Sequence, residues 1–215
     1  MKSRKAVVLL SGGLDSETVL YLAKAKGFFC YCLIFDYGQR HRKEILQAKK
    51  IAGAVGCAYK VLKIAFPWKG SALLDKNIDV PRRTLRGKPA TYVPSRNIIF
   101  LSFAASFAET IGAHDIFIGA HAQDYSGYPD CRPEFLEAFN RMIKVGTYGR
   151  LNVRAPLLHK NKSQIILMGN KLGVPFELSW SCYRGGKIPC FRCDSCRYRA
   201  KGFKEAGLND PLLKI

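Results

Sequence analysis

The hexapeptide SGGLDS at residues 11–16 consists of residue types that can bind phosphate. Its two glycines lack a Cβ, so the main chain can turn sharply and come close to a ligand. An apolar run at residues 7–10 predicts a buried strand before the turn. After the turn, Ser16 can cap a helix over residues 17–26. Free backbone N–H groups and the positive end of the helix dipole would then face one small space, where we expect phosphate oxygens.

This turn resembles the pyrophosphate-binding loop (PP-loop) of the N-type ATP pyrophosphatases, which holds the β and γ phosphates of ATP while the α-phosphorus is attacked. It lacks the motifs of the Walker loop and of the dinucleotide fingerprint. Glu17 stands where that family usually has a small hydroxyl residue, so we expect its carboxylate to point away from phosphate or to help hold a cation. An ordinary strand-to-helix turn is the alternative. The residues expected to bind ATP or pyrophosphate are Leu9, Leu10, Ser11, Gly12, Gly13, Leu14, Asp15 and Ser16.

Four cysteines near the C-terminus have the spacing of metal ligands, and they are Cys182, Cys190, Cys193 and Cys196. Two overlapping Cys-x-x-Cys spacings and a further cysteine brought back by a Gly-Gly turn suit a tetrahedral zinc site. Because all four positions are protein ligands, the predicted zinc is structural rather than catalytic. An iron–sulfur cluster can use the same ligands and stays an alternative. A redox pair would need only two of the four cysteines.

The loop at residues 119–132 combines carboxylates, tyrosines and an arginine with small residues, which predicts a polar, aromatic-lined pocket. Such a pocket fits a planar heterocycle that carries N–H donors and a negative group. His121 lies at a strand end suited to catalysis, but it has no evident carboxylate partner in the sequence and is interpreted as structural. Arg96 begins a helix, where a cation opposes the helix dipole; this favours an anionic partner, the alternative being a loop carboxylate. Lys160 precedes another helix and could reach a phosphate or remain a surface lysine.

These motifs sit between alternating apolar runs and amphipathic stretches, which predict an α/β domain. Ligands of open parallel sheets bind beyond the carboxyl ends of the strands, so the motifs should meet there. Cys30 and Cys32 are interpreted as small buried hydrophobic residues, and Asn161 with Gln164 forms a capping box. The expected strands cover residues 7–10, 28–35, 58–65, 115–118 and 151–155, and the expected helices cover residues 17–26, 41–56, 98–111 and 133–146.

The chain has 215 residues, of which 48% are hydrophobic, enough for one sizeable α/β domain with a small appendage. Its 35 Lys and Arg against 16 Asp and Glu give a net charge of +19, which fits either a nucleic-acid partner or a solvated basic surface. Residues 66–90 lose periodicity and carry a basic cluster, which predicts a lid loop. No apolar run reaches membrane length and no signal-peptide cleavage region is evident, so we expect a cytoplasmic protein without membrane contact.

Six segments in one order resemble the QueC (ExsB) family of 7-cyano-7-deazaguanine synthases: SGGLDS, DYGQRH, YVPSRN, DYSGYPDCR, LLHKNK and SCYRGG with CFRCDSC. Phe191 departs from that family, where a glycine usually follows the cysteine, but every ligand is kept. The resemblance implies an α/β fold of the Rossmann-like, adenine nucleotide alpha hydrolase type. A parallel sheet with helices on both faces would span residues 1–175, and a zinc knuckle with a C-terminal helix would span residues 176–215.

The resemblance also implies a reaction. 7-Carboxy-7-deazaguanine, ammonia and ATP with Mg²⁺ would give the nitrile, AMP and pyrophosphate, in a homodimer that holds one structural Zn²⁺ per chain. Under it, the expected catalytic residues are Asp15, Ser16, Arg96 and Lys160, and the expected substrate contacts are Asn97, Asp124, Tyr128, Asp130 and Arg132. Two other functions stay open. One is a PP-loop enzyme that thiolates or amidates a tRNA base, and the other is a zinc-knuckle nucleic-acid-binding protein with a nucleotide sensor fold.

Overall fold

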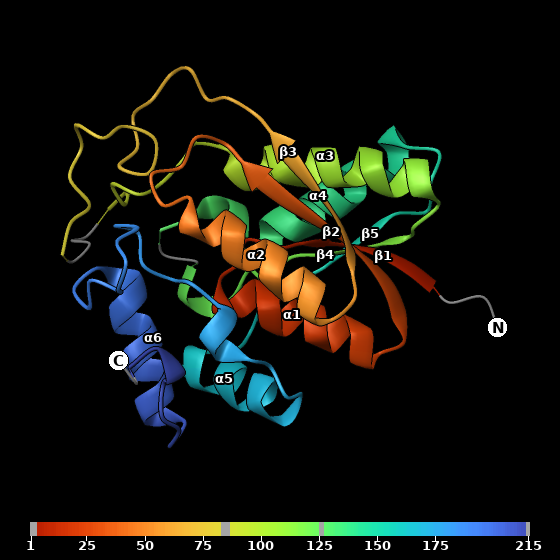
Figure 1. Cartoon of the computed structure of the whole chain (residues 1–215). Helices are drawn as coiled ribbons and strands as arrows, with labels where there is room; N and C mark the ends of the chain where they lie inside the picture. Colours follow the sequence, from red (N-terminus) through yellow and green to blue (C-terminus); the bar gives the residue numbers. More distant parts are fainter. Residues whose placement is uncertain (1–3, 83–86, 125–126, 214–215) are drawn as a thin grey trace.

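A parallel sheet forms the centre of the molecule in a computed structural model that describes residues 4–82, 87–124 and 127–213 (Figure 1). Within these residues the sheet has five strands in the order β3-β2-β1-β4-β5, and every neighbouring pair is parallel. The strand order changes direction next to β1, so a crevice opens between the carboxyl ends of β1 and β4. The strands are β1 Arg4–Leu9, β2 Phe28–Asp36, β3 Ala58–Lys63, β4 Asp115–Phe117 and β5 Asn152–Arg154.

Helices cover both faces of the sheet, as predicted (Figure 1). Alternation along β1 divides the core: Ala6 and Val8 pack toward α1, α2 and α5, whereas Val7 and Leu9 pack toward α3 and α4. Both sets are buried, which explains why the strand is an unbroken apolar run. The helices are α1 Leu14–Ala25, α2 Lys43–Ala54, α3 Arg96–Ile111, α4 Pro133–Gly146, α5 Lys162–Lys171 and α6 Asp194–Glu205.

The start of α1 differs from the prediction. The helix begins at Leu14 with Gly13 as its N-cap residue, so a start at Glu17 and a cap by Ser16 were both wrong. The Ser16 hydroxyl lies inside the helix and donates to the Gly13 carbonyl at 2.9 Å instead. The capping box of α5, made by Asn161 and Gln164, is confirmed.

Residues 66–82 and 87–90 form no helix or strand, but part of this segment is anchored. Ser71, Ala72 and Leu73 are buried, and the Ala72 N–H donates to the Ala90 carbonyl at 2.7 Å. Residues 83–86, at the centre of the predicted basic lid, lie outside the described residues. A lid function for this segment stays a prediction.

The C-terminal helix α6 packs against α5 at the edge of the α/β body (Figure 1). The two helices approach closely at Gly202, where an added Cβ would lie 2.4 Å from Cγ of Lys162. The sequence feature that permits this packing is therefore the missing side chain of Gly202. Among the described residues, no helix combines the length and hydrophobicity of a membrane span.

Candidate active site

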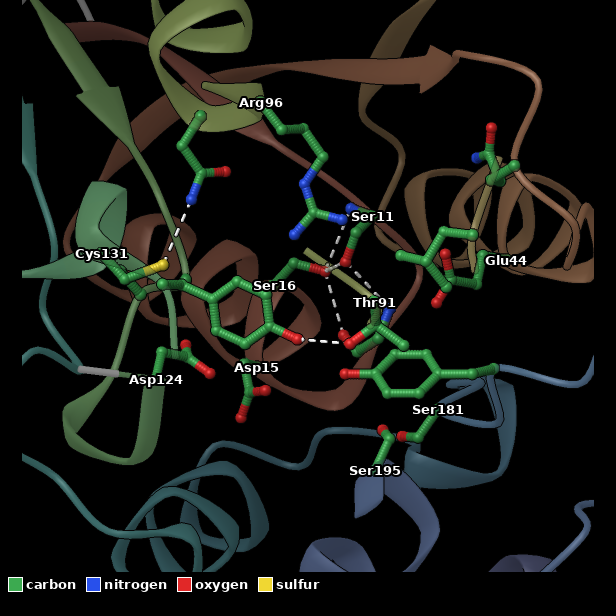
Figure 2. A pocket seen from close by; sticks show the side chains of 18 of the residues that line it. Ser11, Asp15, Ser16, Glu44, Thr91, Arg96, Asp124, Cys131, Ser181 and Ser195 are labelled. Atoms are coloured by element: carbon green, nitrogen blue, oxygen red, sulfur yellow. Dashed lines mark hydrogen bonds between the residues drawn. The ribbon is translucent and has the colours of Figure 1, made fainter. Parts of the chain in front are cut away.

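A cavity of about 620 Å³ opens at the carboxyl ends of β1 and β4. Its wall comes from segments far apart in the sequence: the SGGLDS loop, the end of β2, the start of α3, the loop after β4, Lys162 and the C-terminal segment. Figure 2 shows Ser11, Asp15 and Arg96 around this space, with Ser181 and Ser195 from the C-terminal segment. The predicted meeting of the motifs at this edge of the sheet is what the structure shows.

The SGGLDS loop is held in shape by its own hydroxyl groups. The Ser16 hydroxyl accepts from the Ser11 N–H at 3.2 Å and lies 3.0 Å from the Ser11 hydroxyl. The Ser11 hydroxyl also accepts from the Gly13 N–H at 3.2 Å. The first N–H groups of α1 have no partner within the helix, as at any helix N-terminus. The loop therefore presents main-chain donors to an anion without having to reorganise first.

Gly12 has a structural reason to be glycine. Its φ of +84° is rare for other residues, and an added Cβ would lie 2.2 Å from the Glu44 carbonyl oxygen of α2. On its other side, the Gly12 carbonyl accepts from the Trp180 N–H at 2.8 Å. The loop is thus clamped between α2 and the C-terminal segment.

Three charged or titratable side chains meet at the start of α1. The Lys162 ammonium donates to both carboxylate oxygens of Asp15, at 2.7 and 2.8 Å. Nε2 of His121 lies 3.0 Å from the same ammonium and 3.4 Å from Asp15 Oδ2. Burial alone would raise the pKa of Asp15, but contacts with Lys162 and His121 hold it well below its usual range. Asp15 is therefore a carboxylate at any physiological pH.

Asp124 completes this group from the loop after β4, in the short helix Ala122–Asp124. Its Oδ2 lies 3.5 Å from Nε2 of His121. Burial raises the pKa of Asp124, with the charge of Asp15 adding to the rise and Lys162 opposing it. His121, which had no carboxylate partner evident in the sequence, thus has two in space. Asp15 and Asp124 come from different elements, so sequence proximity did not reveal both.

Lys162 was missed in the sequence, where Lys160 was chosen as the phosphate contact. Lys160 does not line the cavity, whereas Lys162 does and is only 8% exposed. A signal was present, because Lys162 shares the buried face of its helix with Ile165 and Ile166, three and four residues later. A lysine on an apolar helix face is a candidate for a buried functional position.

Arg96 places a positive charge on the opposite side of the cavity (Figure 2). Its guanidinium donates to the Tyr37 hydroxyl at 3.3 Å. Within the described parts of the chain, no carboxylate lies within ion-pair distance of it. Burial lowers the pKa of Arg96, but Tyr37 and Tyr128 raise it further, so the group stays charged. A partly buried guanidinium that lines a cavity and has no carboxylate partner is a binding group for a carboxylate or phosphate.

The predicted substrate residues separate into two groups. Asn97, Asp124 and Tyr128 line the cavity, and the Tyr128 hydroxyl lies 2.8 Å from the Thr91 hydroxyl. Asp130 and Arg132 do not line it. Asp130 instead accepts from the Asn97 N–H at 2.9 Å with Oδ2, and so caps α3. Ser95 occupies the N-cap position without capping, in a left-handed conformation.

Cys131 is the cysteine of this wall, and its environment argues against a nucleophile. Its thiol accepts from the Asn97 side-chain amide at 3.2 Å. Burial raises the pKa of the Cys131 thiol well above its usual value, and Asp124 adds to the rise. A thiol that stays protonated is a poor nucleophile.

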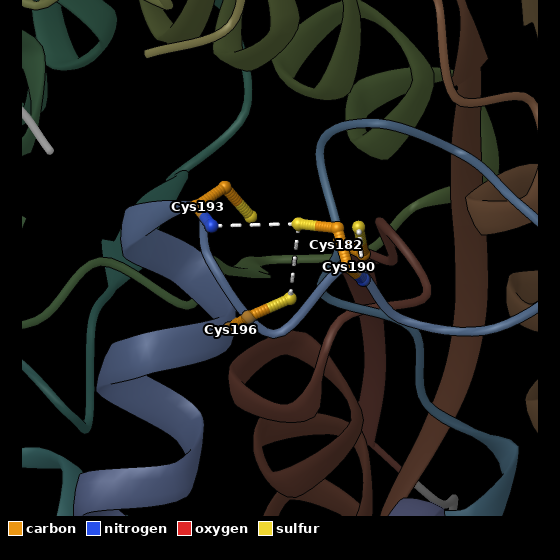
Figure 3. Close-up of side chains that lie close together, drawn as sticks. All are labelled: Cys182, Cys190, Cys193 and Cys196. Atoms are coloured by element: carbon orange, nitrogen blue, oxygen red, sulfur yellow. Dashed lines mark hydrogen bonds between the residues drawn. The ribbon is translucent and has the colours of Figure 1, made fainter. Parts of the chain in front are cut away.

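The four C-terminal cysteines converge as predicted (Figure 3). Their sulfur atoms all lie within 4.8 Å of one another, and three of the four residues are buried. A tetrahedral zinc with Zn–S distances of roughly 2.3 Å requires sulfurs roughly 3.8 Å apart, so the cluster fits such an ion. Phe191, in the loop between ligands, has a φ of +55°, the conformation that glycine would adopt more easily.

The segment around this cluster also forms part of the cavity wall. Trp180, Ser181, Tyr183, Ser195 and Arg199 all line the cavity. The cluster and the SGGLDS loop are thus parts of one assembly rather than separate sites.

Glu17 points into the protein, away from the cavity that the loop lines. It is fully buried, and neither carboxyl oxygen has a hydrogen-bond partner among the described residues. Burial raises the pKa of Glu17 to about 8, which Glu177 adds to and Arg199 opposes. Glu17 is therefore mostly protonated at neutral pH and does not repel phosphate.

The chain matches a family of known function over nearly its whole length. The family model described as queuosine biosynthesis protein QueC matches residues 5–207. A 7-cyano-7-deazaguanine synthase of Nostoc sp. is 52% identical over 220 aligned residues, covering 97% of this chain and 96% of the relative. The synthase of Thermoplasma acidophilum is 50% identical, covering 99% of this chain and 92% of the relative.

The similarity to solved structures concerns the fold only. NMN synthetase from Francisella tularensis superimposes with a TM-score of 0.55 at 16% identity, covering 97% of this chain and 79% of that one. The U34-tRNA thiolase NcsA from Methanococcus maripaludis gives a TM-score of 0.52 at 17% identity, and the superposition covers 96% of this chain and 68% of the thiolase. The sheet, the loop and the cysteine cluster thus agree with the sequence match, and the chain belongs to the QueC family.

Proposed function

We propose that this chain is an ATP-dependent carbon–nitrogen ligase that converts 7-carboxy-7-deazaguanine and ammonia to 7-cyano-7-deazaguanine, with AMP and pyrophosphate as the other products. The observation that carries this proposal is a single cavity that joins the SGGLDS loop to an unpaired guanidinium and a polar, aromatic wall. Membership of the QueC family and synthases about half identical over the whole chain support it.

A carboxylate needs activation before ammonia can attack it, because its oxygen is a poor leaving group. Adenylation converts that oxygen into the leaving group AMP, and ammonia then gives an amide. Adenylation of the amide oxygen allows a second loss of AMP and forms the nitrile. The SGGLDS loop would hold pyrophosphate, with Mg²⁺ neutralising the charge that develops there.

Individual residues take the following roles in this proposal. Asp15 and Ser16 hold Lys162 and the loop in place, and Lys162 contacts phosphate oxygens. Arg96 binds the substrate carboxylate or a phosphate. The substrate base contacts Asn97, Asp124 and Tyr128. Asp130 acts from outside the cavity by capping α3, and Arg132 lies outside the cavity directly before α4. Lys160 has no role.

The cysteine cluster is proposed to hold one structural Zn²⁺ through Cys182, Cys190, Cys193 and Cys196. The four cysteines form no disulfide bonds, and cysteines stay reduced in the cytoplasm. We therefore propose a cytoplasmic enzyme. We also propose a homodimer, as expected from the sequence. Sedimentation velocity at micromolar concentration tests it, and a monomer there would contradict it.

Incubation with 7-carboxy-7-deazaguanine, ATP, Mg²⁺ and ammonium tests the function. We expect AMP to form and the product mass to match the nitrile, with two ATP consumed per nitrile. Arg96→Met should raise the KM for the carboxylate or for ATP, whereas Arg150→Met, outside the cavity, should not. Absence of nitrile together with AMP formation that depends on tRNA would instead indicate an RNA-modifying enzyme.

A further inference from the structure

Asn97, in the first turn of α3, has a side-chain amide whose orientation is fixed. Its Nδ2 donates to the Asp130 carbonyl oxygen at 3.2 Å and to the Cys131 sulfur at 3.2 Å, and both of these residues are buried. A carbonyl oxygen can only accept, so the half of the amide that faces Asp130 has to be the NH2 group. Asp130 also holds the main chain, because its Oδ2 accepts from the Asn97 N–H at 2.9 Å. Turning the amide over would therefore break its hydrogen bonds.

This orientation leaves the amide oxygen of Asn97 as the half that can bind a ligand. Nδ2 already has two acceptors, and no group of the described residues donates to Oδ1. Oδ1 is not one of the buried unpaired atoms of the described chain, and Asn97 lines the cavity. Asn97 therefore offers a ligand a hydrogen-bond acceptor and no donor.

A second acceptor lies in the same wall. The carboxyl group of Asp124 lines the cavity on the side of Cys131 (Figure 2). A base with a guanine-type edge carries three N–H bonds there, one on N1 and two on the 2-amino group. The two oxygens of one carboxylate can accept the N1–H and one amino N–H, which leaves the other amino N–H without a partner. A buried donor without a partner is costly, and a third acceptor oxygen removes that cost.

We propose that the amide oxygen of Asn97 accepts a hydrogen bond from the exocyclic 2-amino group of the substrate base, with Asp130 and Cys131 as the positioning residues that fix it as an acceptor. This assignment rests on the proposed function and deepens it, because it makes Asn97 a determinant of substrate specificity. A base without the amino group leaves Oδ1 desolvated and unpaired in the complex, so it binds less well. An adenine-type edge offers a ring nitrogen that only accepts.

The test compares 7-carboxy-7-deazaguanine with the analogue that lacks the 2-amino group. The measured quantity is the ratio of kcat/KM for nitrile formation from the two compounds, which does not depend on the fraction of enzyme that is folded. Leucine is close to asparagine in shape but has no acceptor. We expect the ratio to be about tenfold smaller in Asn97→Leu than in the unmodified protein, as for the loss of one hydrogen bond. Asn170→Leu, at an exposed position of α5 outside the cavity, should keep the ratio.

Cys131 provides a second pair of variants. In Cys131→Ala one N–H of the Asn97 amide loses its acceptor, so the ratio should fall about threefold. Cys131→Ser keeps an acceptor at this position and should restore the ratio. A purely structural role of Cys131 would change stability without changing the choice between the two compounds.

Three results would overturn the proposal: an unchanged ratio in Asn97→Leu, the same ratio in Cys131→Ala and Cys131→Ser, or a rise in the KM for ATP without a change in the ratio. The last result would assign the amide oxygen of Asn97 to the adenine of ATP. If the unmodified protein forms a nitrile from neither compound, the proposed function fails instead, and this assignment fails with it.

Discussion

The SGGLDS loop and the cysteine cluster are both built for a charged partner, but different forces hold them in shape. In the loop, hydroxyl groups form hydrogen bonds of 2.9–3.2 Å with one another and with the main chain. In the cluster, the contacts are sulfur hydrogen bonds of 3.3–4.0 Å, which are weaker. Hydrogen bonds thus hold the loop in shape, whereas a metal ion bound by the four cysteines would add the stronger bonds that the cluster lacks.

This difference matters because the two regions touch. The main-chain N–H of Trp180 donates to the Gly12 carbonyl of the loop, and Gly202 packs against the aliphatic part of the Lys162 side chain. Loss of the metal should therefore disturb the active site from outside, while damage to the active site should leave the metal in place. The following predictions test that asymmetry in order of decreasing effect.

Cys193→Ser should have the largest effect. Losing one of four ligands removes most of the metal-binding free energy, which contributes to folding, so we expect loss of the metal and several kcal/mol of stability. Metal analysis and thermal unfolding measure both, and Cys57→Ser, outside the cluster, is the matched control. A variant that keeps zinc and stability but loses turnover would show that the metal takes part in catalysis.

Asp15→Ala should lower the rate of AMP formation at least about 1,000-fold, which corresponds to a rise of about 4 kcal/mol in the activation free energy. Without the carboxylate, the Lys162 ammonium loses the partner that fixes its position. The metal content should stay unchanged and the melting temperature close to that of the unmodified protein. Asp79→Ala, at an exposed carboxylate outside the cavity, is the control. Metal loss in Asp15→Ala would disprove the asymmetry between the two regions.

The two regions also differ from the rest of the site in how well the sequence predicted them. SGGLDS and the cysteines are contiguous or closely spaced, and their geometry follows from local turns. The apolar runs predicted where the strands lie, and the burial of β1 on both faces agrees with its unbroken apolar run, whereas the strand order was not predicted. The fold could be predicted because alternation and motif order are properties of a linear chain.

Contacts between distant elements could not be predicted in this way. Lys162 meets Asp15 across 147 residues, and His121 comes near Asp15 only after β1 and β4 pair, whereas Asp124 lies three residues from His121 in the same loop. Asp130 looked like a substrate contact because it is a carboxylate in a pocket-forming loop. It caps α3 instead, because the turn Pro129–Cys131 directs it at the N-terminus of that helix.

Glu17→Gln should change the dependence of stability on pH. The folded carboxyl has a pKa raised to about 8, whereas the unfolded one releases its proton near pH 4.5. The folded state thus binds more protons between these values, and stability falls as pH rises, by up to about 1.4 kcal/mol per pH unit. The variant should lack this decline.

Urea unfolding at pH 5, 6.5 and 8 measures the effect, with Glu137→Gln, an exposed carboxylate, as the control. Equal slopes in Glu17→Gln and the unmodified protein would mean that Glu17 is charged in the folded state. The metal content should be the same in Glu17→Gln, Glu137→Gln and the unmodified protein, because neither residue belongs to the cysteine cluster.

Phe191→Gly should have the smallest effect. The left-handed conformation costs a non-glycine residue about 1 kcal/mol, so the glycine variant should gain roughly 2–4 °C in melting temperature with zinc bound. Phe191→Ala removes the half-exposed ring but keeps the backbone strain, and it should give no gain. An equal gain in both would assign the effect to the ring.

Because Trp180 is hydrogen-bonded to Gly12 through its main-chain N–H, its fluorescence should report on the SGGLDS loop. Of the two tryptophans, Trp68 is 59% exposed and Trp180 only 2%. The Trp180 indole donates to the Cys182 carbonyl at 3.0 Å and carries the Lys43 ammonium 3.6 Å above its ring. Once Trp68 is replaced by phenylalanine, the tryptophan fluorescence comes from one residue that is hydrogen-bonded to both the SGGLDS loop and Cys182. Emission intensity and wavelength should then follow ATP and zinc titrations separately, in unlabelled protein.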